Sequence, residues 1–308
     1  MRLSILIPCR NSEIWLRTSI ESALAQTMPD KEVLVWDDGS TDATCDVLQS
    51  FGERIRWFTG AARGGNHARN RLLDSSRGEW VQFLDADDYL EPAKITRQFA
   101  EACDVTEADI LYSPVFVETW HGGWAAEREA SFIDPAMDLF TQWISWQLPQ
   151  TGGTLWRAEA LRRIGGWNES IPCCQEHELY LRALRAGLRW KFCPSPGAVY
   201  RIWSEETVCR KDPVRVIRTR TELIDRMLAW LRETGRLTSA HRTAAGQAFF
   251  EMARSWARSN LPAATAYLEE RRAGPGVCLR GPAAPARYRL AYRLLGFRGA
   301  EVLARRLR

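Results

Sequence analysis

The sequence predicts an α/β protein, with a mostly parallel sheet flanked by helices and a helical C-terminal extension. In the first hundred residues, short apolar runs alternate with stretches whose apolar residues recur every three or four positions. The short runs are typical of buried strands, and the longer spacing is typical of amphipathic helices. Repeated strand–helix units favour a parallel sheet, because right-handed crossovers place the helices on its two faces.

The first elements follow from this pattern in order. Four strands are expected at 3–7, 32–36, 55–58 and 80–84. The first strand is expected to stop at Pro8, since proline interrupts a strand ladder. Leu16, Ile20 and Leu24 recur every four residues and predict the first helix. The second helix is expected after Asp42, which can act as its N-cap.

A third helix is expected over 66–76, before the fourth strand. Beyond that strand the pattern changes. The region of roughly 104–205 is less regular, with strands expected at 110–112 and 115–117 and loops rich in Gly, Trp and Pro. From about 212 the apolar spacing becomes helical. We therefore expect two domains, 1–210 and 211–308, with the first divided into halves at 103/104.

The last part of the chain is expected to be a linker followed by a basic tail. Residues 273–285 are rich in Gly and Pro, which is typical of linkers. In the tail, Leu290, Leu294 and Phe297 are expected on one side of a helix. Residues 280–308 contain eight Arg and one acidic residue, Glu301. Such a helix either lies on an anionic membrane or packs on the catalytic domain with its Arg in solvent.

Composition limits the class of protein. The chain has 308 residues, of which 45% are hydrophobic and 26% charged, as in ordinary globular proteins. A net charge of +4 is too small to indicate nucleic-acid binding. No run resembles a secretory signal or a transmembrane helix. The eight cysteines form no CxxC pair, so we expect a reduced, cytoplasmic setting without structural zinc.

Several familiar motifs are absent from the sequence. No GxGxxG follows the first strand and no GxxxxGK[ST] occurs, which disfavours a dinucleotide-binding domain and a P-loop NTPase. No Ser or Cys lies in a nucleophile elbow. Cys9 follows the first strand, but no His lies near it in sequence. We therefore interpret Cys9 as a small filler.

A group of three carboxylates, Asp85, Asp87 and Asp88, directly follows the fourth expected strand in "FLDADDYLEP". The group could be a solvated turn that caps the next helix. Alternatively, it could bind a divalent cation, because Mg²⁺ and Mn²⁺ prefer oxygen ligands and often take one or two carboxylates plus phosphate oxygens. Such a cation would neutralise charge on a diphosphate leaving group.

A second acidic stretch, "VWDDGSTD", follows the second expected strand. Asp42 alone would satisfy a helix-capping turn, which leaves Asp37 and Asp38 without that role. The Gly39–Ser40 turn allows a tight reversal. Because ligands of parallel sheets bind at the carboxyl ends of the strands, 8–11, 37–38 and 85–88 should meet at one edge.

Three stretches carry a resemblance to a known family: 4–44, with "SILIPCRNSE" and "VWDDGSTDAT"; 64–92, with "GGNHARN" and "FLDADDYLEP"; and "QEHELYLRALRAG". In this order they resemble the family 2 inverting glycosyltransferases with the GT-A, Rossmann-like fold, over about 1–205. The resemblance implies a nucleotide-binding half at 1–103 and an acceptor-binding half at 104–210. It also implies a nucleotide-diphospho-sugar donor, a divalent cation (Mn²⁺ or Mg²⁺) and direct displacement with inversion.

The resemblance also implies roles for individual residues. Those implied for the nucleotide sugar are Pro8, Arg10, Asp38 (on the base), Arg69, Asp85, Ala86 and Arg201. Those implied for the metal are Asp87 and Asp85, with Asp88 as a further candidate. In "VYRIWS", Trp203 stands where the family often has His, so any metal or phosphate role of that His is lost.

The general base is expected at the start of "QEHEL". The family pattern is usually Glu-Asp followed by x-Glu/Asp-Leu, and its second position is Glu176 here. Gln175 precedes it, and the change from Asp to Glu lengthens the reach, so Glu178 remains the second choice. Alternatively, these acidic residues only favour the first turn of a helix. Gly152 and Gly153, in an acceptor-side loop, and Trp203 are expected on the acceptor side.

Other classes explain the residues less well. A sugar nucleotidyltransferase would usually have a Gly-rich basic loop after the first strand, which "PCRNSE" is not. A catalytically inactive nucleotide-sugar-binding module is disfavoured because both acidic stretches are present. A membrane-surface adaptor would explain only the tail. We expect a UDP- or dTDP-type donor, a carbohydrate or lipid-linked acceptor, a role in polysaccharide or envelope synthesis, and no nucleic-acid partner.

Overall fold

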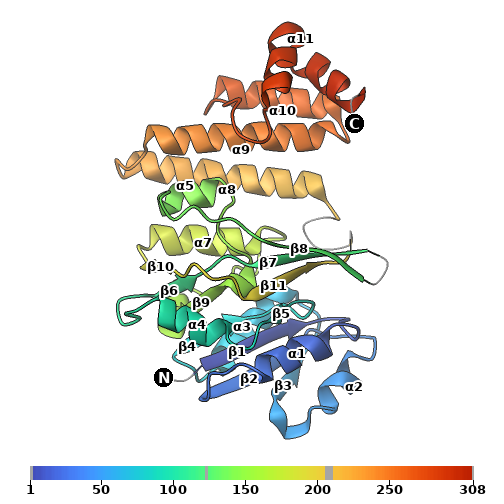
Figure 1. Ribbon diagram of the computed structural model, residues 1–308, viewed down its shortest axis with the longest axis vertical. Helices are drawn as coiled ribbons and strands as arrows, with labels where there is room; N and C mark the ends of the chain where they lie inside the picture. Colours follow the sequence, from blue (N-terminus) through green and yellow to red (C-terminus); the bar gives the residue numbers. More distant parts are fainter. Residues whose placement is uncertain (1–2, 122–123, 205–210, 307–308) are drawn as a thin grey trace. The chain divides into compact units, whose positions relative to one another are not determined.

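The computed structural model describes residues 3–121, 124–204 and 211–306 (Figure 1). The chain forms two compact units, Met1–Pro135 with Leu148–Glu205, and Ala136–Gln147 with Glu206–Arg308. The expected boundary at 210 lies outside the described residues. The segment Ala136–Gln147 was expected in the first domain but belongs to the second unit, because its helix packs on helices from the C-terminal part of the chain.

A seven-stranded sheet forms the centre of the first unit, in the order β10-β6-β9-β4-β1-β2-β3. Its strands are β1 (Leu3–Cys9), β2 (Lys31–Asp37), β3 (Arg56–Thr59), β4 (Trp80–Phe83), β6 (Ile110–Tyr112), β9 (Thr154–Arg157) and β10 (Trp190–Phe192). Only β9 runs antiparallel to its neighbours, β4 and β6. The predicted mostly parallel sheet is therefore confirmed, although β9 was expected to be a loop.

The helices of the first unit bury apolar faces against this sheet (Figure 1). They are α1 (Leu16–Leu24), α2 (Thr44–Gln49), α3 (Gly65–Ser75), α4 (Lys94–Glu101), α6 (Ala158–Arg163) and α7 (Gln175–Arg185). In α1 the predicted repeat is confirmed, since Leu16 and Ile20 are fully buried. Asp42 lies one residue before the N-cap of α2, and its Oδ1 accepts a hydrogen bond from Thr44 N at 3.1 Å.

The expectation that the first strand stops at Pro8 was wrong. Strand β1 continues to Cys9 and pairs with β2 along its whole length. Its pairing with β4, on the other side, ends at Leu6. Pro8 therefore has a strand neighbour on one side only, and its missing N–H leaves no gap in a ladder.

A second sheet of the first unit has the strand order β5-β11-β7-β8. Its strands are β5 (Tyr89–Leu90), β7 (Phe116–His121), β8 (Trp124–Ala130) and β11 (Ala198–Ile202). Strand β5 directly follows the acidic residues 85–88, and β11 pairs with it antiparallel through Val199 and Tyr89. This pairing brings a segment that is more than a hundred residues away beside the acidic turn.

The second unit is helical. It contains α5 (Leu139–Ile144), α8 (Pro213–Glu233), α9 (Ser239–Ala257), α10 (Leu261–Ala273) and α11 (Ala286–Arg306). The predicted repeat of α8 is confirmed, since Leu223, Met227 and Leu231 are buried. The Gly/Pro-rich stretch 273–285 connects α10 to α11, as expected for a linker.

Helix α11 differs from its prediction. Gly296 has φ +67° and ψ −175°, which divides the helix into two segments (red in Figure 1). Phe297 is buried, whereas Leu290 and Leu294 are 59% and 74% exposed, so the three residues do not share one buried face. The break changes the direction of the second segment, and Tyr288 and Tyr292 occupy the buried side of the first.

Among the described residues, no helix combines the length and the apolar character needed to cross a bilayer.

Candidate active site

The acidic residues form a turn between β4 and β5. Asp88 N donates to Asp85 O at 3.0 Å, and Ser19 Oγ of α1 donates to the same carbonyl at 3.2 Å. The Asp85 side chain is one quarter exposed, and its Oδ1 accepts a hydrogen bond from Arg69 Nη2 at 2.7 Å. The turn is therefore fixed from its backbone, while one carboxylate oxygen of Asp85 faces a buried cation.

Arg69 of α3 is buried beneath this turn. Its guanidinium lies 4.6 Å from the ring centre of Trp167, and Nη1 donates to Asn66 Oδ1 at 3.2 Å. Burial disfavours its charge, but Asp85, Glu176 and Asp87 outweigh that effect and raise the pKa of Arg69. Its Nε is buried without a hydrogen-bond partner in the described structure. Arg69 thus supplies a fixed positive charge to several carboxylates.

The other two carboxylates of the turn are more deeply enclosed. Asp87 Oδ2 accepts a hydrogen bond from the indole Nε1 of Trp203 at 2.9 Å. Burial and the charge of Asp85 raise the pKa of Asp87 above its ordinary value. Asp88 Oδ1 accepts from Arg201 N at 2.8 Å, and burial with the charges of Asp87 and Asp85 raises the pKa of Asp88 well above that value.

Arg201 of β11 lies among aromatic rings beside the acidic turn. Its guanidinium is 4.7 Å from the ring centres of both Trp15 and Tyr89, and 5.9 Å from that of Trp120. Burial lowers the pKa of Arg201, against the opposing charge of Asp88. Its Nε and Nη1 are buried and have no hydrogen-bond partner in the described structure. A buried cation with open donors favours a role in binding anionic oxygens.

Asp37 and Asp38 of the second acidic stretch have different roles. Asp37 accepts hydrogen bonds from Ser40 and Thr59 and so holds the turn itself. Asp38 Oδ1 and Oδ2 accept the backbone N–H groups of Arg63 and Gly64 at 2.9 and 2.7 Å. Asp38 therefore connects the end of β2 to the start of α3, and both oxygens still have acceptor capacity.

The turn requires a glycine at position 39. Gly39 has φ +71°, and an added Cβ would lie 2.9 Å from Ala62 N. The tight reversal that the sequence predicts is thus present. It keeps Asp38 at the carboxyl end of β2.

Glu176 and Glu178 in the first turn of α7 have different surroundings. Glu176 is partly exposed, and its Oε1 accepts a hydrogen bond from Thr151 Oγ1 at 2.6 Å. Glu178 is 2% exposed and forms an ion pair with Arg182, whose Nε lies 2.9 Å from Oε1 and whose Nη2 lies 2.9 Å from Oε2. Glu178 therefore has a partner for both oxygens, whereas the described contacts of Glu176 engage one oxygen.

Electrostatic effects connect Glu176 with the acidic turn. Glu176, Asp85 and Asp87 all raise the pKa of Arg69. Burial raises the pKa of Tyr180, and Glu176 and Asp85 add to this effect. The first turn of α7 and the acidic turn therefore lie around one buried arginine, although almost ninety residues separate them in sequence.

The remaining predicted residues lie at different depths. Pro8 and Ala86 are buried, while Arg10 is exposed and its N–H donates to Ser12 Oγ at 3.3 Å. Gly152 and Gly153 are buried in the 3₁₀ turn η2 (Thr151–Gly153) that precedes β9. Their carbonyls accept hydrogen bonds from Gln82 Nε2 and Gln98 Nε2 at 3.1 and 3.0 Å. The side-chain amides of Gln82 and Gln98 thus fix the loop that carries Thr151.

Three residues in the site were not predicted. Thr151 holds Glu176, Trp167 stacks on Arg69, and Trp15 stacks on Arg201. Nothing in their local sequence distinguishes them from core residues. In the structure, the two glycines before Trp167, Gly165 and Gly166, have positive φ and form the turn that places its ring. The thiol of Cys9, by contrast, is buried, and burial with the charge of Asp37 raises its pKa, as a filler role requires.

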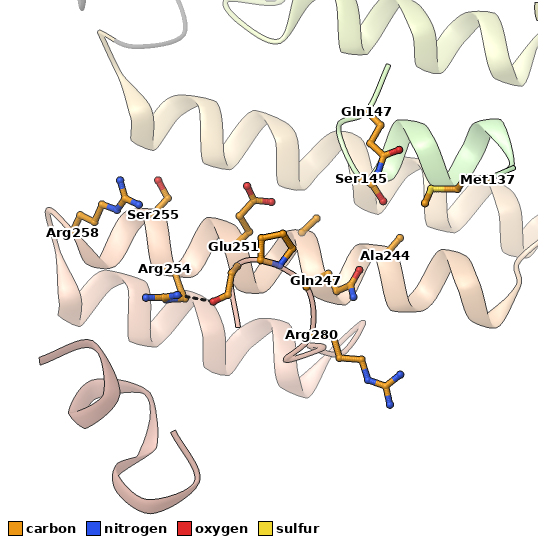
Figure 2. Close-up of a pocket in the computed structure, with 14 residues that line it drawn as sticks. Met137, Ser145, Gln147, Ala244, Gln247, Glu251, Arg254, Ser255, Arg258 and Arg280 are labelled. Atoms are coloured by element: carbon orange, nitrogen blue, oxygen red, sulfur yellow. Dashed lines mark hydrogen bonds between the residues drawn. The ribbon is translucent and has the colours of Figure 1, made fainter. Parts of the chain in front are cut away.

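One described cavity was not predicted from the sequence. A cavity of about 650 Å³ in the second unit lies between α5, α9 and residues 280–283, and Figure 2 shows that its charged groups point in different directions. It contains none of the predicted site residues. Within the described ranges, no group of three or more His, Cys, Asp or Glu side chains is arranged to hold a metal ion.

Comparisons with known proteins identify the family of the chain. The family model described as "Glycosyl transferase family 2" matches residues 4–165, which is more than half of the chain. The chondroitin synthase of Escherichia coli is 29% identical over 196 residues, covering 60% of this chain and 27% of that protein. The chain spans less than two thirds of the length of the curated relatives first matched.

Two solved structures share the fold. TarS of S. aureus, in complex with UDP-GlcNAc, superposes with a TM-score of 0.66 at 18% identity, covering 99% of this chain and 92% of that one. The mannosyltransferase PcManGT of Pyrobaculum calidifontis, in complex with GDP-Man and Mn²⁺, superposes with a TM-score of 0.54 at 19% identity, covering 98% and 85%. Together with the family match, these likenesses confirm the predicted GT-A fold, and the chain belongs to glycosyl transferase family 2.

Proposed function

We propose that this glycosyltransferase moves a sugar from a nucleotide-diphospho-sugar to a hydroxyl acceptor with inversion at the anomeric carbon. The observation that carries the proposal is the convergence of Asp85, Asp87 and Glu176 on Arg69. The first two carboxylates suit a cation at the leaving group. The third suits proton abstraction from the acceptor.

The reaction needs a single displacement. The acceptor hydroxyl oxygen forms a bond to the anomeric carbon while the bond from that carbon to the diphosphate oxygen breaks. The proton of the hydroxyl passes to the carboxylate of Glu176. This carboxylate suits the role of general base because it is partly exposed and interacts with the charge of Arg69. Thr151 donates to one oxygen of Glu176 and so orients the other. We assign Glu178 a structural role because Arg182 occupies both its oxygens.

The acidic turn fits a divalent cation by the chemistry of its donors. Contacts with other described residues engage Oδ1 of Asp85 and Oδ2 of Asp87, which leaves a hard oxygen on each. Asp88 is less suitable because it is buried and accepts from Arg201 N. We propose Mn²⁺ or Mg²⁺ held by Asp87 and Asp85 together with diphosphate oxygens. When bound, the cation would stabilise the charge of the leaving diphosphate.

Three further groups would bind the donor. We propose that Asp38 accepts the imide N–H of the base, since the backbone bonds of Arg63 and Gly64 hold it in place. A UDP- or dTDP-type donor has such an N–H. Pro8, Arg10 and Ala86 would line the nucleoside and sugar. The open N–H groups of Arg201 support a contact with phosphate oxygens.

The acceptor is proposed to be a carbohydrate or a lipid-linked saccharide used in polysaccharide or envelope synthesis. The likeness to a chondroitin synthase supports a saccharide acceptor. Gly152 and Gly153, beside Thr151, and the partly exposed indole of Trp203 would lie on the acceptor side. A lipid-linked acceptor would be reached at the cytoplasmic face of a membrane. We therefore propose that the protein acts in the cytoplasm, at that face.

Thermal unfolding with a panel of nucleotide sugars, each with and without Mn²⁺, tests the donor and the metal together. We expect a UDP- or dTDP-sugar to raise Tm only when Mn²⁺ is present, and Asp87→Ala to abolish that dependence along with transfer. The anomeric configuration of the product, read by NMR, tests inversion. Full turnover in excess EDTA would contradict the metal proposal. Donor binding without any hydrolysis or transfer would favour an inactive binding module.

A further inference from the structure

The charge of α11 is more one-sided than its sequence alone indicates. Glu301 is the one acidic residue between 280 and 308. It is 3% exposed, and its Oε1 accepts hydrogen bonds from Arg254 Nε at 2.6 Å and from Tyr288 Oη at 2.7 Å. That negative charge is therefore neutralised inside the unit. The charged side chains that the described helix exposes are all arginines.

Large apolar side chains are exposed among these arginines. In the first segment, Leu294 is the most exposed, at 74%, and the described surface also includes the neighbours Leu290 and Leu295. In the second segment, Val302 and Leu303 are 44% and 39% exposed. Five large apolar residues on about twenty positions of one helix exceed the scattered exposure that is normal for a protein surface.

The opposite side of α11 already holds the helix in place. Tyr288, Tyr292 and Phe297 pack on Phe250 of α9, with ring centres 5.8, 5.9 and 6.3 Å apart. The exposed leucines are therefore not needed to anchor the helix. They form a second face with no partner in the described structure.

The two segments meet in an apolar groove. Gly299 lets them approach, since a Cβ at that position would lie 2.5 Å from Leu295 Cβ. The groove has a volume of about 380 Å³ and is lined by Leu295, Arg298, Gly299, Val302, Leu303 and Arg306. Its walls are mainly apolar and its rim carries two arginines. This is the pattern of a helix that lies at the boundary between headgroups and acyl chains.

We infer that this surface docks on an anionic lipid membrane. The surface, called the α11 face below, consists of Arg287, Leu290, Arg293, Leu294, Leu295, Arg298, Val302, Leu303 and Arg306. Its leucines would enter the acyl boundary, and its arginines would pair with lipid phosphates. A second copy of the chain is a poor occupant because it would bring the same positive charge against itself.

The inference does not depend on the proposed reaction and uses a binding experiment. The full chain is sedimented with vesicles of phosphatidylcholine alone and with vesicles containing about 30% phosphatidylglycerol, as an anionic surface. We expect binding to the anionic vesicles only, and release by about 0.5 M salt, which screens surface charge.

Two double variants separate the charges from the leucines. Arg287→Gln/Arg293→Gln should weaken binding by about 25-fold, at about fivefold for each arginine near the surface. Leu294→Ser/Leu295→Ser should weaken it at least tenfold and make the remainder fully salt-sensitive. Both pairs are exposed, so folding should be retained. The matched controls, Arg232→Gln/Arg242→Gln and Phe132→Ser, change exposed residues elsewhere and should bind like wild type.

Several outcomes would overturn the inference. Equal binding to neutral vesicles would remove the requirement for anionic lipid. An unchanged affinity of the leucine variant would show that the apolar face does not insert. If light scattering shows a dimer that the leucine variant loses, and vesicles do not bind, the face is a contact between copies. Binding to neither vesicle by a monomer also refutes the proposal.

Discussion

Two buried arginine–carboxylate pairs, one in each unit, differ in how completely they are enclosed. In the second unit, Arg254 Nε donates to Glu301 Oε1, which also accepts a hydrogen bond from Tyr288 Oη. Arg254 Nη1 donates to Ala283 O, and this bond is the dashed line in Figure 2. In the first unit, Arg69 pairs with Asp85 but keeps a buried Nε without a described partner, and Asp85 is one quarter exposed.

This difference separates a structural ion pair from a candidate ligand-binding site. A closed pair satisfies its own hydrogen bonds and contributes to folding. An open pair retains buried donors and acceptors that no described residue satisfies, which is typical of positions that a ligand completes. Arg201 extends the open group, since it too has unpartnered N–H groups.

The largest effect is expected at Glu176, on the open side. Glu176→Gln retains a hydrogen-bond acceptor for Thr151 but cannot take a proton, so transfer should fall by about 10²–10⁴-fold. Donor affinity should stay within a few-fold, because the donor groups are unchanged. Steady-state kinetics with a donor-binding assay measures both. In the matched variant Glu178→Gln, the ion pair with Arg182 is broken, so stability should fall more than transfer. The reverse result would move the base to Glu178.

The next effect is expected at the closed pair. Arg254→Met leaves Glu301 buried without its cation, which should lower the free energy of unfolding by about 3 kcal/mol. Transfer per folded molecule should not change. Denaturant unfolding provides the measurement. The double variant Arg254→Met/Glu301→Leu should recover part of the loss, because it removes the stranded charge. An equal loss in both variants would show that the pair is not a closed unit.

Lys94 is a third case, a buried lysine that has no carboxylate partner among the described residues. Its Nζ donates to Gln82 Oε1, and Gln82 in turn donates to Gly152 O. Burial lowers the pKa of Lys94 to about 7. Above that pH the unfolded chain binds a proton that the folded chain lacks, so stability should rise with pH.

The expected gain is about 2 kcal/mol between about pH 7 and about pH 9. Lys94→Met should remove this dependence, which unfolding curves at several pH values would reveal. A similar rise in the variant would assign the effect to other groups. Lys191→Met, which changes an exposed lysine, is the control.

The smallest effect is expected at Trp203. Its indole N–H lowers the pKa of Asp87 against the raising effects of burial and Asp85. Trp203→Phe keeps the ring but loses the donor, so the pKa of Asp87 should rise further. The acidic limb of the pH–activity profile should move to higher pH by less than about one unit. No shift of that limb, with activity otherwise retained, would mean that Asp87 does not limit the reaction.

Local patterns in the sequence predicted much of the fold. The repeat at Leu16 and Ile20 predicts α1, and the polar residues after each strand predict which edge carries the site, because both depend on neighbours in the chain. Strand β9 was not predicted, since four residues in a Gly-rich loop do not show that they will lie between β4 and β6. The helical segment 136–147 gave no sign that it belongs with the C-terminal unit.

The family motifs and the residue types of the site follow from the sequence alone, because carboxylates and turn glycines are specified position by position. Only the tertiary structure distinguished Glu176 from Glu178, since the partner of Glu178 lies one turn along α7 and that of Glu176 comes from η2. It also decided which side of α11 is exposed, through the bend at Gly296 and the packing on Phe250. Burial and pairing depend on residues that are distant in sequence, and a local pattern does not contain them.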